Sequence, residues 1–270
     1  MRTIEREGCK LKKEAVMRPD LKQALADYLL AMADDELILG HRDSEWCGHA
    51  PILEEDIAFA NIALDEIGHA QLWYTLLAEL LHEDSQVYPD QLVYRRSPDD
   101  FRNVRMLELP NGDWAFSMLR QYLFDTSELV RMNALVDSQY QALAGAASQV
   151  KKEELYHLRH TRAWIQRLAL GTEESHRRLQ NALNSLWPLA QQLFLAYPAE
   201  ERLVGEGLVS SSADIRTAWQ AQVLPDLQAG NLELPPAGSP PASRREHGKH
   251  LKVLVREMQS VARLDPQAQW

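Results

Sequence analysis

The sequence contains little of what marks secreted, membrane or nucleic-acid-binding proteins. Two cysteines among 270 residues are too few for a disulfide framework, so a reducing cytosol is the expected compartment. The charged first 16 residues hold no apolar secretion segment, and no apolar run approaches the ~20 residues needed to cross a bilayer. The net charge of -10, without a basic run, argues against a nucleic-acid surface. We therefore expect neither membrane nor nucleic acid as a partner.

Glycine is also scarce, at 12 residues, and no segment shows the alternating pattern of a strand. Alanine, leucine, glutamine and glutamate are frequent, and these residues lose little freedom on entering a helix. The sequence therefore predicts an all-α protein. We expect residues 1–19 to be a flexible tail and residues 20–270 to form one helical domain, with a core bundle over about 20–170 and a helical annex over about 173–270.

Apolar residues at helical spacing predict four long helices in the core. They cover about residues 20–40, with Asp20 as N-cap, 53–81, 113–142, with Asp113 as N-cap, and 149–170. We expect residues 41–51 to form a loop and the small residues 144–148 to end the third helix. The annex is expected to contain helices over about 173–197, broken near Pro188, 213–227 and 245–264, with a proline-rich linker over 229–243.

Each long helix places a carboxylate among its core-facing apolar residues. Two helices supply one glutamate each and the other two supply Glu-x-x-His, so the candidate metal ligands are Glu36, Glu66, His69, Glu128, Glu154 and His157. Asp125 lies one turn before Glu128 on the same face and is an alternative to it. A Glu and a His three residues apart project from one helical face, so both can reach one metal ion.

Several ionised carboxylates in one core would each cost several kcal/mol without a compensating charge. Two divalent ions would supply that charge, and this ligand pattern is the one found in ferritin-like dimetal proteins. Mixed carboxylate and imidazole ligation suits iron or manganese. The sequence therefore predicts a ferritin-like four-helix bundle around a two-metal site. Of the neighbouring residues, we expect His160 to pair with Glu153 on the surface and Cys47 to be a packed thiol.

Several short runs resemble one known family. The most specific is Trp-Cys-Gly-His-Ala-Pro at 46–51, and others are Ala-Asn-Ile-Ala-Leu-Asp at 60–65, Leu-Pro-Asn-Gly at 109–112, Arg-Gln-Tyr at 120–122, Tyr-His-Leu-Arg at 156–159 and Gln-Ala-Gln-Trp at 267–270. From about residue 20 to its end, the chain resembles the C subunits of phenylacetyl-CoA epoxidase. This enzyme is the multicomponent ring 1,2-monooxygenase of aerobic phenylacetate breakdown.

The resemblance implies a non-catalytic scaffold subunit that pairs stably with a homologous A subunit, where the di-iron oxygenase chemistry occurs. It also implies assembly with other epoxidase subunits, including the reductase. Typical C subunits have lost several metal ligands, whereas this sequence keeps the whole set. An accessory centre of two Fe or Mn ions is therefore an open alternative for this chain. The apolar faces of the last helices, with Trp270, are the expected contact with the A subunit.

Two other functions stay open. The chain is a di-iron oxygenase or oxidase in its own right if its metal positions are accessible to substrate. It is a metal-storage or ferroxidase-like protein if it assembles symmetrically with itself, which an acidic chain with a proline-rich linker does not favour.

Overall fold

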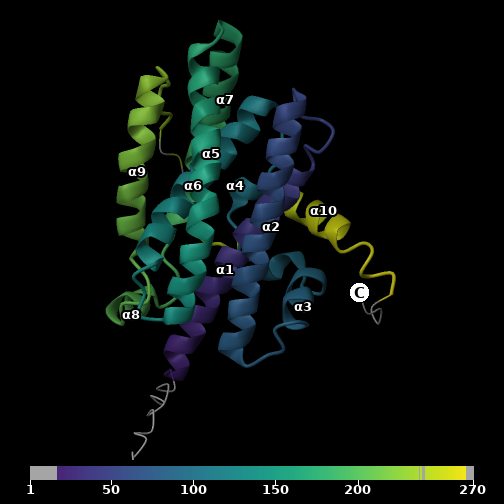
Figure 1. Cartoon of the computed structure of the whole chain (residues 1–270), viewed down its shortest axis with the longest axis vertical. Helices are drawn as coiled ribbons and strands as arrows, with labels where there is room; N and C mark the ends of the chain where they lie inside the picture. The colour runs from purple at the N-terminus through teal and green to yellow at the C-terminus, as the bar shows by residue number, and fades with distance from the viewer. Residues whose placement is uncertain (1–16, 237, 239–240, 266–270) are drawn as a thin grey trace, which may run out of the picture.

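The structure, a computed structural model, describes residues 17–236, 238 and 241–265 (Figure 1). Every regular element in these ranges is a helix, which confirms the predicted all-α class. None of the helices in this part of the chain is both long and apolar enough to cross a membrane. Most of the expected tail, residues 1–16, and the terminal Trp270 lie outside the described residues.

Four long helices form the centre of the molecule. They are α1 (Pro19–Ser44), α2 (Leu53–Leu81), α5 (Trp114–Leu135) and α6 (Gln141–Leu170). α1 packs along α2, α5 packs along α6, and α2 also contacts α6, as Figure 1 shows. The apolar stripes that predicted these helices form the core between them, where Leu25, Tyr122 and Val150 are fully buried. Their close packing fixes the positions of the polar side chains that share the same stripes.

Shorter helices surround this bundle. They are α3 (Tyr88–Tyr94), η1 (Pro98–Asp100), α4 (Arg105–Glu108), α7 (Glu173–Ala190), η2 (Gln191–Phe194), α8 (Glu200–Gly205), α9 (Ser212–Ala229) and α10 (Lys249–Met258). α7 and α9 pack on α5, and α10 contacts α4 and η1. The α9 residue Trp219 is fully buried and donates a hydrogen bond to the carbonyl oxygen of Leu123 at 3.0 Å. The annex therefore covers the outer side of α5.

The predicted limits of the first helix are wrong at both ends. α1 begins at Pro19 rather than after Asp20, because proline is well suited to the first position of a helix. It continues to Ser44, beyond the expected end at residue 40. Arg42 in this last turn donates to the carbonyl oxygen of Glu108 at 2.8 Å. This contact with a distant segment holds the extra turn in place.

The expected break between the third and fourth helices is also misplaced. α5 ends at Leu135 and α6 begins at Gln141, so the small residues 144–148 lie inside a helix. Ser138 makes the break because its hydroxyl donates to the carbonyl oxygen of Leu208 at 2.7 Å and accepts from the Tyr140 amide at 3.2 Å. A serine that bonds its own backbone competes with helix formation, whereas alanine favours it.

The last helix is shorter than the expected 245–264, since α10 covers only Lys249–Met258. Buried Glu108 accepts a hydrogen bond from the Gly248 amide at 2.6 Å and lies 2.6 Å from Nδ1 of His247. These contacts hold the residues before Lys249 outside the helix.

The segment between α1 and α2 contains the Trp-Cys-Gly-His-Ala-Pro run. Trp46 turns inward, where its indole N–H donates to the Ser117 hydroxyl at 3.0 Å and its ring meets Trp114 edge-on. Gly48 takes a positive φ of 77° and its amide donates to Asp56. Cys47 between them is exposed, so the expectation of a packed thiol is wrong.

Candidate metal centre

The bundle brings five of the six predicted ligands, together with Asp125, into buried clusters. One group of side chains, whose ligand atoms all lie within 4.8 Å of one another, is Glu36, Glu66, His69 and Glu154. A second such group is Glu66, Asp125 and His157. Every one of these residues is at most 3% exposed. The two groups share Glu66, so they form one continuous centre.

The two glutamates of the Glu-x-x-His motifs lie between the two histidines. Nδ1 of His69 is 3.4 Å from Oε1 of Glu154, on the opposite helix, and 4.0 Å from Oε2 of Glu66. Nδ1 of His157 is 3.5 Å from Oε1 of Glu66 and 3.6 Å from Oε1 of Glu154. Both histidines therefore present the same ring nitrogen to the same pair of carboxylates.

The outer nitrogen of each imidazole meets a further carboxylate. Nε2 of His69 lies 2.7 Å from Glu153, and Nε2 of His157 lies 3.2 Å from Asp65. A carboxylate on the outer nitrogen fixes the tautomer and leaves the inner nitrogen as a metal ligand. The expected pairing of Glu153 with His160 is wrong, because His160 lies 3.0 Å from Glu55 instead.

Sequence reasoning missed Asp65 and Glu153, although a signal was present. Each acid directly precedes the glutamate of one Glu-x-x-His motif and reaches the histidine of the other. The doubled acid before each motif therefore marks two helices that face each other through their histidines.

On α5 the structure separates the two alternative ligands. Asp125 accepts hydrogen bonds from Gln121 at 2.8 Å and from Thr161 at 2.8 Å, and Gln121 also donates to Glu66 at 2.7 Å. Oε1 of Glu128 instead lies 3.1 Å from Nη1 of Arg131, an ion-pair distance. Asp125 is thus part of the centre, and Glu128 has a cation from its own helix.

Three consecutive acids on α1 are buried, and their partners differ. Asp34 is bound by Arg96 and by the Arg102 amide, and Asp35 is 2.7 Å from Arg244. Both carboxylate oxygens of Glu36 lack a hydrogen-bond partner among the described residues. Asp34 and Asp35 therefore have arginine partners, whereas Glu36, which faces the centre, has no hydrogen-bond partner among the described residues.

Burial and neighbouring charges shift the pKa values of the acids and histidines in the centre. Burial raises the pKa of Glu36, Glu66 and Asp125. Burial also acts to raise the pKa of Glu154, but the nearby imidazoles of His157 and His69 outweigh it and lower that pKa to about 2. For His69, burial favours the neutral ring, yet the nearby carboxylates of Glu154 and Glu36 raise its pKa to about 12. Without a metal ion, the neighbouring carboxylates therefore favour the protonated, positively charged form of both histidines.

The buried oxygen and nitrogen atoms of the centre are suited to binding two divalent metal ions, because many of them make no hydrogen bond within the protein. Among the described residues, several buried donor atoms have no hydrogen-bond partner: both carboxylate oxygens of Glu36 and Glu154, Oε2 of Glu66, and Nδ1 of His69 and His157. Such orphaned groups are costly in a protein core. Two divalent ions would also balance the four ionised carboxylates of the two clusters, with neutral histidines as ligands.

The ion pair between Glu128 and Arg131 yields a stability prediction. Arg131→Met should lower the free energy of unfolding by about 3–5 kcal/mol, because it leaves a buried carboxylate without its cation. Urea denaturation measures the change. The double variant Arg131→Met, Glu128→Gln should recover most of the loss. A single variant within about 1 kcal/mol of the wild type would show that the pair does not compensate Glu128.

The chain is similar in sequence to known proteins over its whole length. The family described as phenylacetic acid catabolic protein matches the chain over residues 1–270. The chain belongs to this family. Within it, the chain is 36% identical to the C subunit of 1,2-phenylacetyl-CoA epoxidase from Escherichia coli K12, over 91% of this chain and 99% of the relative. It is 26% identical to the A subunit of the same organism's epoxidase, over 60% of this chain and 51% of that relative.

A solved structure shows the fold. The Synechococcus protein described as having aldehyde deformylating oxidase activity superposes with a TM-score of 0.60, at 12% identity, over 92% of this chain and all of that one. That protein is a ferritin-like bundle, so the predicted ferritin-like fold of this family member is confirmed. The buried carboxylate and histidine cluster of this chain is compatible with a dimetal site in such a bundle.

Proposed function

We propose that this chain is the scaffold subunit of a phenylacetyl-CoA epoxidase and that its bundle holds two iron or manganese ions. The likeness to an epoxidase C subunit over nearly the full length of both chains supports the first part. The observation that supports the second is the set of buried donor atoms without protein partners. Metal analysis of the purified chain, described in the Discussion, tests it.

Each residue of the centre has a defined part in this proposal. Glu36 and His69 would hold one ion, Asp125 and His157 would hold the other, and Glu66 and Glu154 would serve both. Glu128, predicted as a ligand, stays a candidate that competes with its ion pair to Arg131. Bound iron or manganese would add redox chemistry to a centre whose own residues offer only acid–base and hydrogen-bonding groups.

Burial around the centre favours a scaffold over a catalyst. No side chain of the two ligand groups is more than 3% exposed. Met32, Trp73 and Met132, each one helical turn from a predicted ligand, are fully or almost fully buried. These carboxylates are therefore not directly exposed to an acyl-coenzyme A thioester in this conformation. The complete ligand set favours the second candidate, a di-iron oxygenase in its own right, and the Discussion gives the experiment that separates the two.

The surface offers a face for the A subunit. α2 exposes large apolar side chains along one side, namely Leu53, Ile57, Leu64 and Ile67, and α6 exposes Leu155 and Tyr156. The contacts of His69 with Glu153 and of His157 with Asp65 hold the two helices together at this level. Stable protein–protein interfaces are large, with an apolar centre. We propose that this α2/α6 face contacts the A subunit.

This assignment differs from the expectation, drawn from the family resemblance, that the last helices make the contact. α10 does expose Val253, and Val261 and Leu264 beyond it are exposed as well. Among the described residues, more of the large exposed apolar side chains lie on α2 and α6 than on α10 and the residues after it. The two faces can be tested against each other.

Leu64→Asp should weaken binding of the A subunit by at least about tenfold, because it places a charge in an apolar interface. Leu64 is 66% exposed, so the fold of the isolated chain should not change. The matched control is Val253→Asp, which alters a residue of 62% exposure on α10. Co-expression with the A subunit followed by size-exclusion chromatography measures the complex. Independent elution of the two wild-type chains at micromolar concentration would refute the pairing, and loss of complex only in Val253→Asp would move the contact to α10.

A further inference from the structure

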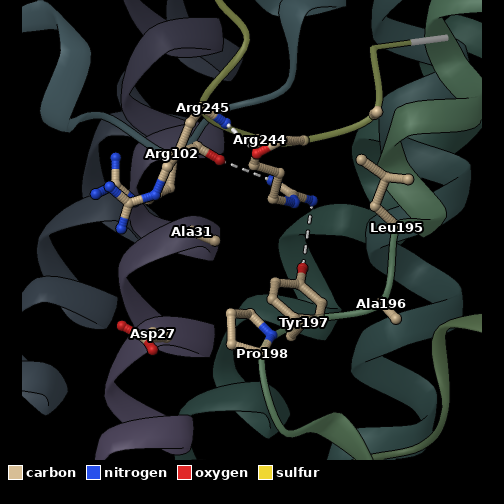
Figure 2. Close-up of a pocket in the computed structure, with 11 residues that line it drawn as sticks. Asp27, Ala31, Arg102, Leu195, Ala196, Tyr197, Pro198, Arg244 and Arg245 are labelled. Atoms are coloured by element: carbon tan, nitrogen blue, oxygen red, sulfur yellow. Dashed lines mark hydrogen bonds between the residues drawn. The ribbon is translucent and has the colours of Figure 1, made fainter.

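A pocket distinct from the metal centre lies between α1, the segment after η1, the segment after η2 and the segment before α10. Its volume is about 410 Å³. Figure 2 shows the residues that line it, which are Asp27, Ala31, Arg102, Leu195, Ala196, Tyr197, Pro198, Ala242, Ser243, Arg244 and Arg245. Pockets of this size hold small organic molecules.

Three arginines line this pocket in a chain whose net charge is -10. Arg244 is compensated, because its Nη1 lies 2.7 Å from Asp35. The Arg102 side chain donates to carbonyl oxygens, those of Phe101 at 2.7 Å and Asp99 at 3.3 Å. Within the described ranges, neither Arg102 nor Arg245 forms an ion pair with a carboxylate. The pocket therefore contains two cationic groups whose charge the described protein groups do not neutralise directly.

Arg102 and Arg245 lie close to one another, and Arg102 is partly buried. Burial lowers the pKa of Arg102, and the neighbouring charge of Arg245 lowers it further. The Arg244 side chain is only 9% exposed, and its Nε has no hydrogen-bond partner among the described residues. An anion beside Arg102 and Arg245 would relieve the repulsion between them.

Polar and apolar parts of the lining are separated, which gives a ligand an orientation. Figure 2 shows Arg244 between the carbonyl oxygen of Arg102 and the hydroxyl of Tyr197, to which it donates at 3.0 and 3.3 Å. The Tyr197 hydroxyl accepts this bond and keeps its own proton to donate. The single carboxylate of the lining, Asp27, is drawn at the lower left of the view, on the same side as the guanidinium groups of Arg102 and Arg245. Leu195 and Pro198 supply an apolar wall.

We propose that this pocket binds a small organic anion, a phosphate monoester or a carboxylate, with its charged group on Arg102 and Arg245 and its apolar part toward Leu195 and Pro198. Arginine presents several N–H donors in a planar fork that matches the oxygens of either group. The pocket shares no residue with the metal centre, so the site is independent of the proposed epoxidase role.

Isothermal titration calorimetry of the whole chain with phenyl phosphate and with phenylacetate tests the proposal. At least one probe should bind, and the stronger one identifies the charged group. Inorganic phosphate, which lacks the apolar part, should bind more weakly than phenyl phosphate. Arg102→Ala and Arg245→Ala should each weaken binding about tenfold, the usual effect of losing a charged hydrogen bond.

The matched control is Arg159→Ala, which removes an exposed arginine from α6, outside the pocket. It should bind the probes like the wild type. Thermal unfolding checks that Arg245→Ala, which alters an exposed side chain, keeps the fold. Absence of binding by both organic probes at millimolar concentration would overturn the proposal. Equal weakening by Arg159→Ala and Arg245→Ala would also overturn it, because the attraction would then be general rather than local.

Discussion

After anaerobic reconstitution with ferrous iron and gel filtration, the chain is expected to retain about two metal ions per molecule. Glu66→Ala should lose one or both of them, since Glu66 belongs to both ligand groups. His157→Ala should lose at least the ion of the second group. Inductively coupled plasma mass spectrometry on the filtered protein gives the stoichiometry. These losses should be large, because each variant removes a ligand from a buried site.

The two acids of α5 make a matched pair in the same experiment. Asp125→Asn should reduce metal content, because Asp125 lies in the second ligand group. Glu128→Gln should leave metal content nearly unchanged, because Arg131 compensates Glu128. The reverse outcome would make Glu128 the ligand that the helical spacing predicts. Failure of the wild type to keep any iron or manganese would refute the metal site and leave proton sharing among the acids as the explanation of the centre.

The isolated chain with the reductase, but without the A subunit, is expected to show no turnover of phenylacetyl-CoA. The ligands of its centre are at most 3% exposed, so we expect the thioester not to reach them in the isolated chain. In the assembled complex, Glu66→Ala in this chain should reduce activity far less than removal of a metal ligand from the A subunit. Product formation measured by liquid chromatography gives both results.

Two controls make the activity experiment decisive. The complex containing Glu66→Ala must elute with wild-type stoichiometry, so that lost activity is not lost assembly. Its metal content must be measured in parallel. If the isolated chain consumes the substrate, or if Glu66→Ala silences an intact complex, the chain carries a working active site and the scaffold assignment is wrong.

Periodicity in the sequence was sufficient to predict the four long helices but not all their limits. The predicted second helix, 53–81, agrees with α2, and Asp113 caps α5 by accepting from the Phe116 amide at 3.0 Å. The limits failed where a distant contact decides them. Ser138 ends a helix through Leu208, and Glu108 holds Gly248 outside α10. Such partners lie 70 and 140 residues away in sequence, beyond the reach of local pattern.

The candidate site follows a similar division. The Glu-x-x-His spacing placed Glu66, His69, Glu154 and His157 on facing helices, and the structure brings them together. The choice between Asp125 and Glu128 could not be made from spacing, because both lie on one face of α5. It depends on which acid Arg131 reaches, and that follows from packing. The arginine pocket was not predictable at all, since its lining comes from four separate segments of the chain.

Anomalous diffraction at the iron edge, on crystals of the anaerobically iron-loaded chain, tests the dimetal site most directly. We expect two strong peaks inside the bundle, one beside Glu36 and His69 and one beside Asp125 and His157, with Glu66 and Glu154 contacting both. Absence of peaks in the bundle, or peaks only at surface acids, would contradict the dimetal site.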